Sequence, residues 1–112
     1  EPIALNLATS HPRLLCVHGI LEENGEGAWL ILGGAFHQGV QLLKQKLSGL
    51  VSIRDQTPKG KHYLGVHPNN LCNQGNAGGG LQLELSSGLR KHLSSNPKLL
   101  RSFSISLTEA LN

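Results

Sequence analysis

Two short apolar runs of this 112-residue chain each end close to a glycine. Residues 14–17 form the first run, directly before His18 and Gly19, and residues 28–32 form the second, before two further glycines. A short apolar run bounded by turn-forming residues is typical of a buried strand. Since no run approaches the ~20 residues needed to cross a bilayer, the sequence predicts no membrane-spanning segment.

Segments with helical periodicity alternate with these runs. Apolar residues recur every three or four positions within residues 35–47, which predicts a helix. We expect a second helix to begin at Ser86 or Ser87 and a third to cover residues 97–111, although residues 102–106 alternate as a strand would. The alternation predicts an α/β domain with a mixed sheet flanked by helices. Further strands are expected at residues 51–53, 62–66 and 81–85.

Composition limits the possible partners. The length fits one domain, residues 1–112. A net charge of +3 favours anionic partners, but the basic residues are scattered and only four aromatic residues are present, so nucleic-acid binding is not predicted. Cys16 and Cys72 are too few for a disulfide framework and are expected to be reduced, with a single bridge as the alternative. A start at Glu1 and the absence of Met suggest a fragment of a longer protein.

Glu84 is the carboxylate whose position is unusual. In Leu81-Gln82-Leu83-Glu84-Leu85 the period of two places the leucines on one face of the strand and Gln82 with Glu84 on the other. Glutamate is depleted in strands, and an ionised carboxylate is costly to bury without a partner. Glu84 therefore either lies on the solvent face of an edge strand or faces a crevice, as a general base or a metal ligand.

His18 and the residues of one long loop are further candidates. His18 follows an apolar strand, so it is either a structural histidine or a metal ligand that shares a zinc site with Glu84. The glycines at 75–80 lack the Lys-Ser or Lys-Thr that a phosphate-binding loop needs, and a strand follows them. Cys72 with His67 could act as a nucleophile and base, although no third residue that would orient the base is evident.

Several motifs together resemble the poly-gamma-glutamate hydrolase family of phages and bacteria. They agree with that family in order and spacing over most of the chain. They are CVHG at residues 16–19, WLILGG at 29–34, GVHPNNLCNQG at 65–75, GGLQLEL at 79–85 and GLR at 88–90.

The resemblance implies a three-layer α/β/α fold, similar to zinc carboxypeptidases, and zinc-dependent cleavage of γ-glutamyl amide bonds in a soluble protein of a bacterium or phage. It implies that His18 is a zinc ligand and that Glu84 is the general base. The implied substrate-binding residues, which would line a cleft for an anionic peptide or polymer, are His67, Asn70, Asn73, Gln74 and Arg90.

Two departures from the family are visible. Family members tend to have Asn-Arg-Gly where this chain has Asn73-Gln74-Gly75, so a cation that could hold a substrate carboxylate is missing there. The His-Gly-Gly-type motif and glutamate that supply further zinc ligands are also missing. The chain is therefore expected to be the C-terminal part of a longer hydrolase domain, inactive alone, and to associate with itself or with a complementary N-terminal fragment. The alternative is a non-catalytic binding module that has lost its metal.

Overall fold

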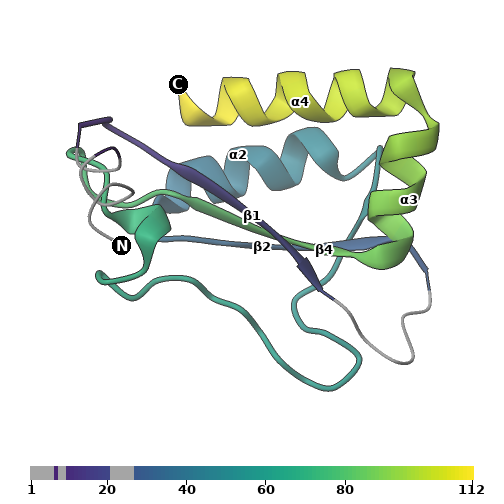
Figure 1. Cartoon of the computed structure of the whole chain (residues 1–112), viewed down its shortest axis with the longest axis horizontal. Coiled ribbons are helices and arrows are strands. Elements are labelled where there is room, and N and C mark those ends of the chain that lie inside the picture. The colour runs from purple at the N-terminus through teal and green to yellow at the C-terminus, as the bar shows by residue number, and fades with distance from the viewer. Residues whose placement is uncertain (1–6, 8–9, 21–26) are drawn as a thin grey trace.

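The structure is a computed structural model that describes residues 7, 10–20 and 27–112. Figure 1 shows the arrangement of its helices and strands. In chain order, the elements are β1 (Leu15–Ile20), β2 (Trp29–Gly33), α2 (His37–Leu47), β3 (Ser52–Ile53), the 3-10 helix η1 (Leu71–Asn73), β4 (Leu81–Ser86), α3 (Ser87–Ser95) and α4 (Pro97–Leu111).

The four strands form one mixed sheet in the order β1-β4-β2-β3. Strand β4 pairs in parallel with β1 and antiparallel with β2, and β3 extends the sheet in parallel with β2. The predicted α/β domain with a mixed sheet flanked by helices is therefore confirmed. Because β4 is internal, both of its neighbours protect it from solvent, and all six of its residues are buried.

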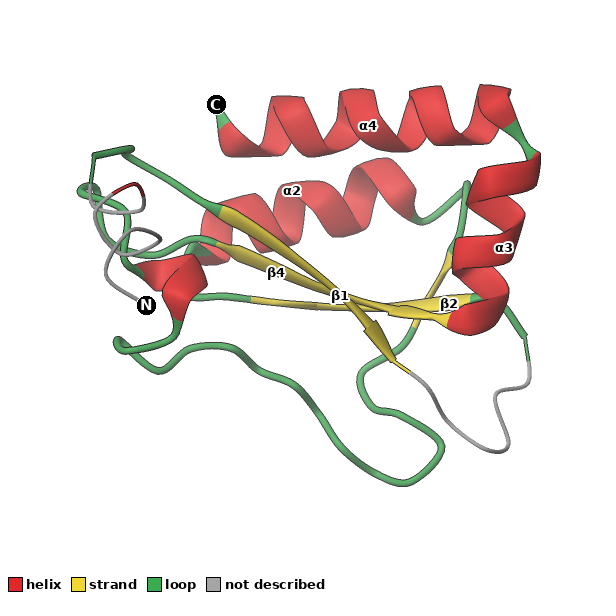
Figure 2. Ribbon diagram, in the orientation of Figure 1, coloured by secondary structure: helices red, strands yellow, loops and turns green. Residues whose placement is uncertain are grey.

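The main hydrophobic core lies between the sheet and the helices. Leucines of β4 alternate into this core, and Leu30 of β2 joins them from the neighbouring strand. Helices α2 and α4 lie on this side of the sheet, whereas the long connection between β3 and β4 runs along the other side (Figure 2). In the described ranges, helices thus flank one face only, so these residues do not form the second helical layer of a three-layer fold.

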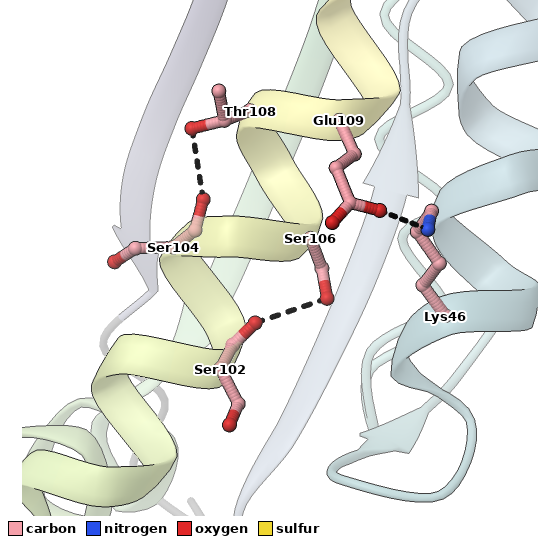
Figure 3. A network of polar contacts seen from close by, with 6 residues as sticks. All are labelled: Lys46, Ser102, Ser104, Ser106, Thr108 and Glu109. Atoms are coloured by element: carbon pink, nitrogen blue, oxygen red, sulfur yellow. Dashed lines mark hydrogen bonds and ion pairs between the residues drawn. The ribbon is translucent and has the colours of Figure 1, made fainter.

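Helix α4 contains the serines whose alternation resembles a strand. Hydroxyl groups on the helix donate to backbone carbonyls one turn earlier, from Ser106 to Ser102 at 3.0 Å and from Thr108 to Ser104 at 3.1 Å (Figure 3). Such bonds satisfy a hydroxyl group within a helix. Pro97 occupies the first turn, where its missing N–H costs nothing, and Lys46 of α2 forms an ion pair with Glu109. The predicted helix over residues 97–111 is confirmed.

Two local predictions are wrong. Residues 62–66 are not a strand, because Tyr63 and Gly65 both have positive φ angles, of 49° and 62°, which break the extended conformation. Strand β1 does not end at His18 but continues to Ile20. His18 therefore lies in the middle of this edge strand and not at the strand's C-terminal end. None of the described helices is long and apolar enough to cross a membrane.

Candidate active site

Glu84 and His18 lie side by side on one face of the sheet. They are register partners in the parallel pair formed by β4 and β1. Register partners on neighbouring strands point to the same face, and for Glu84 this face is opposite the one that carries Leu83 and Leu85. Glu84 is only 5% exposed, whereas His18 is exposed. The interpretation of Glu84 as a solvent-facing residue of an edge strand is therefore wrong.

The surroundings of Glu84 favour a carboxyl group that can exchange a proton. Burial raises its pKa above the usual range, and the neighbouring His18 opposes this shift because a positive imidazolium stabilises the carboxylate. Within the described residues, the ion pair present joins Lys46 and Glu109, so the Glu84 carboxylate forms none there. A buried carboxyl group with a raised pKa is suited to general base catalysis.

An apolar cluster extends this face away from Glu84. Ile20, Trp29 and Ile31 pack together there, and Tyr63 covers them from the connection between β3 and β4. This close approach depends on Gly33, because a Cβ at that position would lie 2.6 Å from the carbonyl oxygen of Tyr63. The polar pair of Glu84 and His18 is thus bordered by a water-excluding surface on the β2 side.

Two asparagines that the family resemblance assigns to substrate binding hold the loop before β4 in place. The Asn73 side chain accepts from the N–H groups of Ala35 and Gly80, at 3.0 and 2.9 Å, and donates to two carbonyls of residues 65–67. Asn70 donates to the side chain of Gln82 at 2.9 Å. Since Gln82 is on the Glu84 face of β4, these contacts bring the loop to the edge of the site.

His67 and Gln74 belong to the same loop and retain polar atoms that can reach a ligand. The Nδ1 atom of His67 accepts from the N–H of Asn69 at 3.0 Å, and its exposed ring leaves Nε2 free of described partners. Gln74 donates through Nε2 to the carbonyl of Pro68 and is half-buried. The loop whose Asn70 contacts Gln82 therefore also carries these two polar side chains.

Arg90, also predicted to bind substrate, lies elsewhere. Its guanidinium packs against Gly19, where a Cβ would collide with it, and donates to the carbonyl of Ile20 at 3.3 Å. Gly19 alternates with His18 along β1, so its Cβ position is on the helix side of the sheet. The structure therefore separates Arg90 from Glu84 and His18.

The nucleophilic alternative, Cys72 with His67, is not supported by the geometry. Cys72 is fully buried, and its pKa is raised to about 11 by burial and by the nearby Cys16. The Cys72 thiol contacts the carbonyl of Gly65 rather than a His67 ring nitrogen. A thiol that stays protonated at neutral pH is a poor nucleophile. Both cysteines are free.

Comparison with known proteins identifies the family. A family model described as poly-gamma-glutamate hydrolase matches residues 1–110. The chain belongs to the poly-gamma-glutamate hydrolase family. A relative, UPF0714 protein YndL of Bacillus subtilis strain 168, is 30% identical over 93 residues, which are 83% of this chain and 36% of YndL.

Two solved structures share the fold of this chain. The chain matches a bacteriophage poly-gamma-glutamate hydrolase with a TM-score of 0.80 and 21% identity, over 98% of this chain and 56% of that protein. It matches the zinc-free apo form of YndL with a TM-score of 0.76 and 25% identity, over 99% of this chain and 58% of YndL. The chain thus spans from about a third to just over half the length of these relatives.

The described residues by themselves do not complete a zinc site. A catalytic zinc ion takes three protein ligands. Across residues 7, 10–20 and 27–112, no three histidine, cysteine, aspartate or glutamate side chains are grouped so that they could hold a metal. His18, which is exposed, is the single imidazole that the described register places beside Glu84.

Sequence reasoning overlooked the structural importance of Gln82. Its side chain is buried, accepts from Asn70 and lies 3.5 Å from the carbonyl of Tyr63, so it joins the two segments that border the site. The period of two that singles out Glu84 places Gln82 on the same face. This periodicity is the sequence signal that could have identified Gln82. Its partners could not be foreseen because they come from an irregular loop.

Proposed function

We propose that this chain contributes the general base, Glu84, and one zinc ligand, His18, to a zinc-dependent hydrolase that cleaves γ-glutamyl amide bonds of poly-gamma-glutamate or a similar acidic peptide. The observation that carries the proposal is the pairing of a buried carboxyl group with an exposed imidazole on one sheet face. Family membership supports the same reaction class. Because the chain spans only part of its relatives, the activity is proposed for the whole hydrolase domain.

The chemistry assigned to this chain is proton transfer. Burial weakens the solvation of the Glu84 carboxylate, so it accepts a proton from an attacking water more readily than an exposed carboxylate does. Once the water has attacked the amide carbon, Glu84 can return this proton to the departing amine. The apolar cluster of Ile20, Trp29 and Ile31 limits access of bulk water on one side. Zinc dependence requires ligands besides those described.

A non-catalytic binding module remains a second candidate, and the incomplete donor set of the described residues favours it. Such a module would bind an anionic polymer at the same face without cleaving it. Binding without turnover by the zinc-loaded full-length protein would support this candidate.

The direct test is cleavage of γ-linked polyglutamate by the full-length protein, followed by the loss of polymer length. We expect Glu84→Gln to lower kcat by about 10²–10⁴-fold, because the amide cannot accept the water proton. Glu109→Gln is the matched control, since Glu109 lies on α4 and contacts Lys46 rather than the site. The α-linked polymer should be a poor substrate. Equal turnover by wild type and Glu84→Gln would contradict the proposed role of Glu84.

A further inference from the structure

Arg54 lies on the same sheet face as the proposed base. We propose that Arg54 binds a carboxylate of the substrate and so selects acidic polymers. The inference deepens the proposed hydrolase function and rests on it. It assigns a specificity-determining role to a residue outside the sequence motifs, in the segment that follows β3.

The pairing of β3 with β2 places Arg54 in a row with the site residues. Trp29 pairs with Ser52 and Leu30 with Ile53, and the N–H of Arg54 donates to the carbonyl of Leu30 at 2.9 Å. Continuing this register puts Arg54 beside Ile31.

Ile31 is itself the register partner of Glu84. His18, Glu84, Ile31 and Arg54 therefore follow one another across the same face, on four neighbouring segments of chain. Neighbouring strands are ~4.8 Å apart, so the backbone of Arg54 lies on the order of 10 Å from that of Glu84. Ile31 between them is buried beneath Tyr63, so a substrate that contacts both Glu84 and Arg54 would pass over Tyr63.

The guanidinium of Arg54 is supported by Trp29. Its Cζ atom lies 5.6 Å from the centre of the indole ring, within the range of a cation–π interaction. Trp29 is fully buried and cannot move away easily. In the described part of the chain, Arg54 forms no ion pair. A guanidinium group can donate two parallel hydrogen bonds to a carboxylate.

Arg54 borders a cavity of about 630 Å³. His62 and Thr57 also line it. Two hydrogen bonds close the loop that forms its wall: the N–H of Thr57 donates to the carbonyl of Lys61, and the N–H of Lys61 donates to the Thr57 hydroxyl. Asp55 lines the cavity as well and opposes an anion there. Arg54 is the one lysine or arginine among the lining residues, so the proposed anion contact rests on its guanidinium and not on the net charge of the lining.

The chemistry of a γ-linked polymer matches this arrangement. Every internal γ-linked glutamyl unit keeps a free α-carboxylate. Each unit beyond the scissile bond therefore presents one anion to the protein. One cation beside the site would therefore bind the polymer in a fixed position relative to Glu84. A neutral polymer would lack this contact.

The test is binding of a γ-linked glutamate tetramer to the full-length protein, measured by calorimetry in a Glu84→Gln background that cannot turn the ligand over. We expect Arg54→Gln to weaken binding by roughly 10- to 100-fold, as for loss of a charge-assisted hydrogen bond. Arg54→Lys should restore part of the affinity. Lys59→Gln is the matched control, because it removes the same charge from the same loop without lining the cavity, and it should change affinity less than about threefold.

A tetramer in which the α-carboxylates are replaced by carboxamides should bind weakly, with the same affinity whether or not the protein carries Arg54→Gln. In the active protein, Arg54→Gln should raise KM and leave kcat nearly unchanged. If Arg54→Gln binds the tetramer as tightly as its parent, or if no form binds it, the inference is wrong. Loss of turnover in Glu84→Gln is a separate result, so the proposed base and the proposed Arg54 contact can fail independently.

Discussion

Glu84 combines two opposing requirements at the scale of a single residue. Its burial raises the pKa, which suits a proton acceptor, but an ionised carboxylate in this position opposes folding. His18 partly offsets this effect by stabilising the charged form. The site therefore tolerates a locally unfavourable charge, as is common where a group is held ready for catalysis.

The stability cost of Glu84 can be measured through its pH dependence. Because its pKa is raised by folding, protonation of Glu84 stabilises the folded state below the ordinary carboxyl pKa, and this contribution is lost as pH rises through the folded-state pKa. Glu84→Gln should therefore be more stable than wild type near neutral pH by about 1 kcal/mol, or roughly 4–8 °C in Tm.

The difference between these two proteins should shrink towards about pH 4, where wild-type Glu84 is also neutral. Thermal unfolding across this range is the measurement, with the exposed Asp55→Asn as control. A Glu84→Gln protein that is less stable than wild type at neutral pH would argue against a charge that opposes folding.

At the scale of elements, one loop depends on Asn73. This buried side chain links the loop before β4 to the N–H groups of Ala35 and Gly80. Gly80 also approaches the carbonyl of Cys72 so closely that a Cβ would not fit. The contacts of Asn73 and Gly80 thus determine the conformation of the loop that carries His67 and Gln74.

Replacing Asn73 should loosen this loop. In Asn73→Ala two backbone N–H groups lose their acceptor, and we expect a loss of about 2–4 kcal/mol in the free energy of unfolding. Hydrogen exchange should accelerate at Ala35 and Gly80. Asn76→Ala is the control, because Asn76 is exposed and bonds through its backbone. Unchanged exchange at both amides would contradict the anchoring role.

The elements also show what could be read from the sequence. Apolar runs and helical periodicity predicted the main strands and helices, because these patterns reflect burial on one face. The period of two in residues 81–85 also identified Glu84 as a candidate site residue. Strand order could not be predicted, since β4 is last in the chain but internal in the sheet. Pairing between distant segments determines three features that the sequence does not reveal. They are the internal position of β4, the row that includes Arg54 and the separation of Arg90 from Glu84.

At the scale of the whole molecule, β1 leaves one edge of the sheet open. No described strand pairs with its outer side, and Val17, which points to the helix side, is 54% exposed. An open strand edge that carries an exposed apolar side chain favours pairing with another chain. For the 112-residue chain by itself, we therefore expect association with a second copy through β1.

Sedimentation over a range of concentrations tests this expectation. The average mass should rise with concentration for the wild-type chain, and Val17→Lys should shift it towards the monomer because a charge would be buried at the contact. Ile105→Lys is the matched control, since Ile105 is 52% exposed on α4, away from β1. A wild-type chain that stays monomeric at every concentration would rule out this association.

The central claim is that His18 and Glu84 meet on one face and that His18 stabilises the charged form of Glu84. NMR titration of the Glu84 side-chain carboxyl carbon, in wild type and in His18→Gln, measures this directly. We predict a Glu84 pKa above the usual range in wild type and higher still in His18→Gln, because the positive imidazolium is lost. An ordinary Glu84 pKa, or identical titration curves in the two proteins, would contradict the claim.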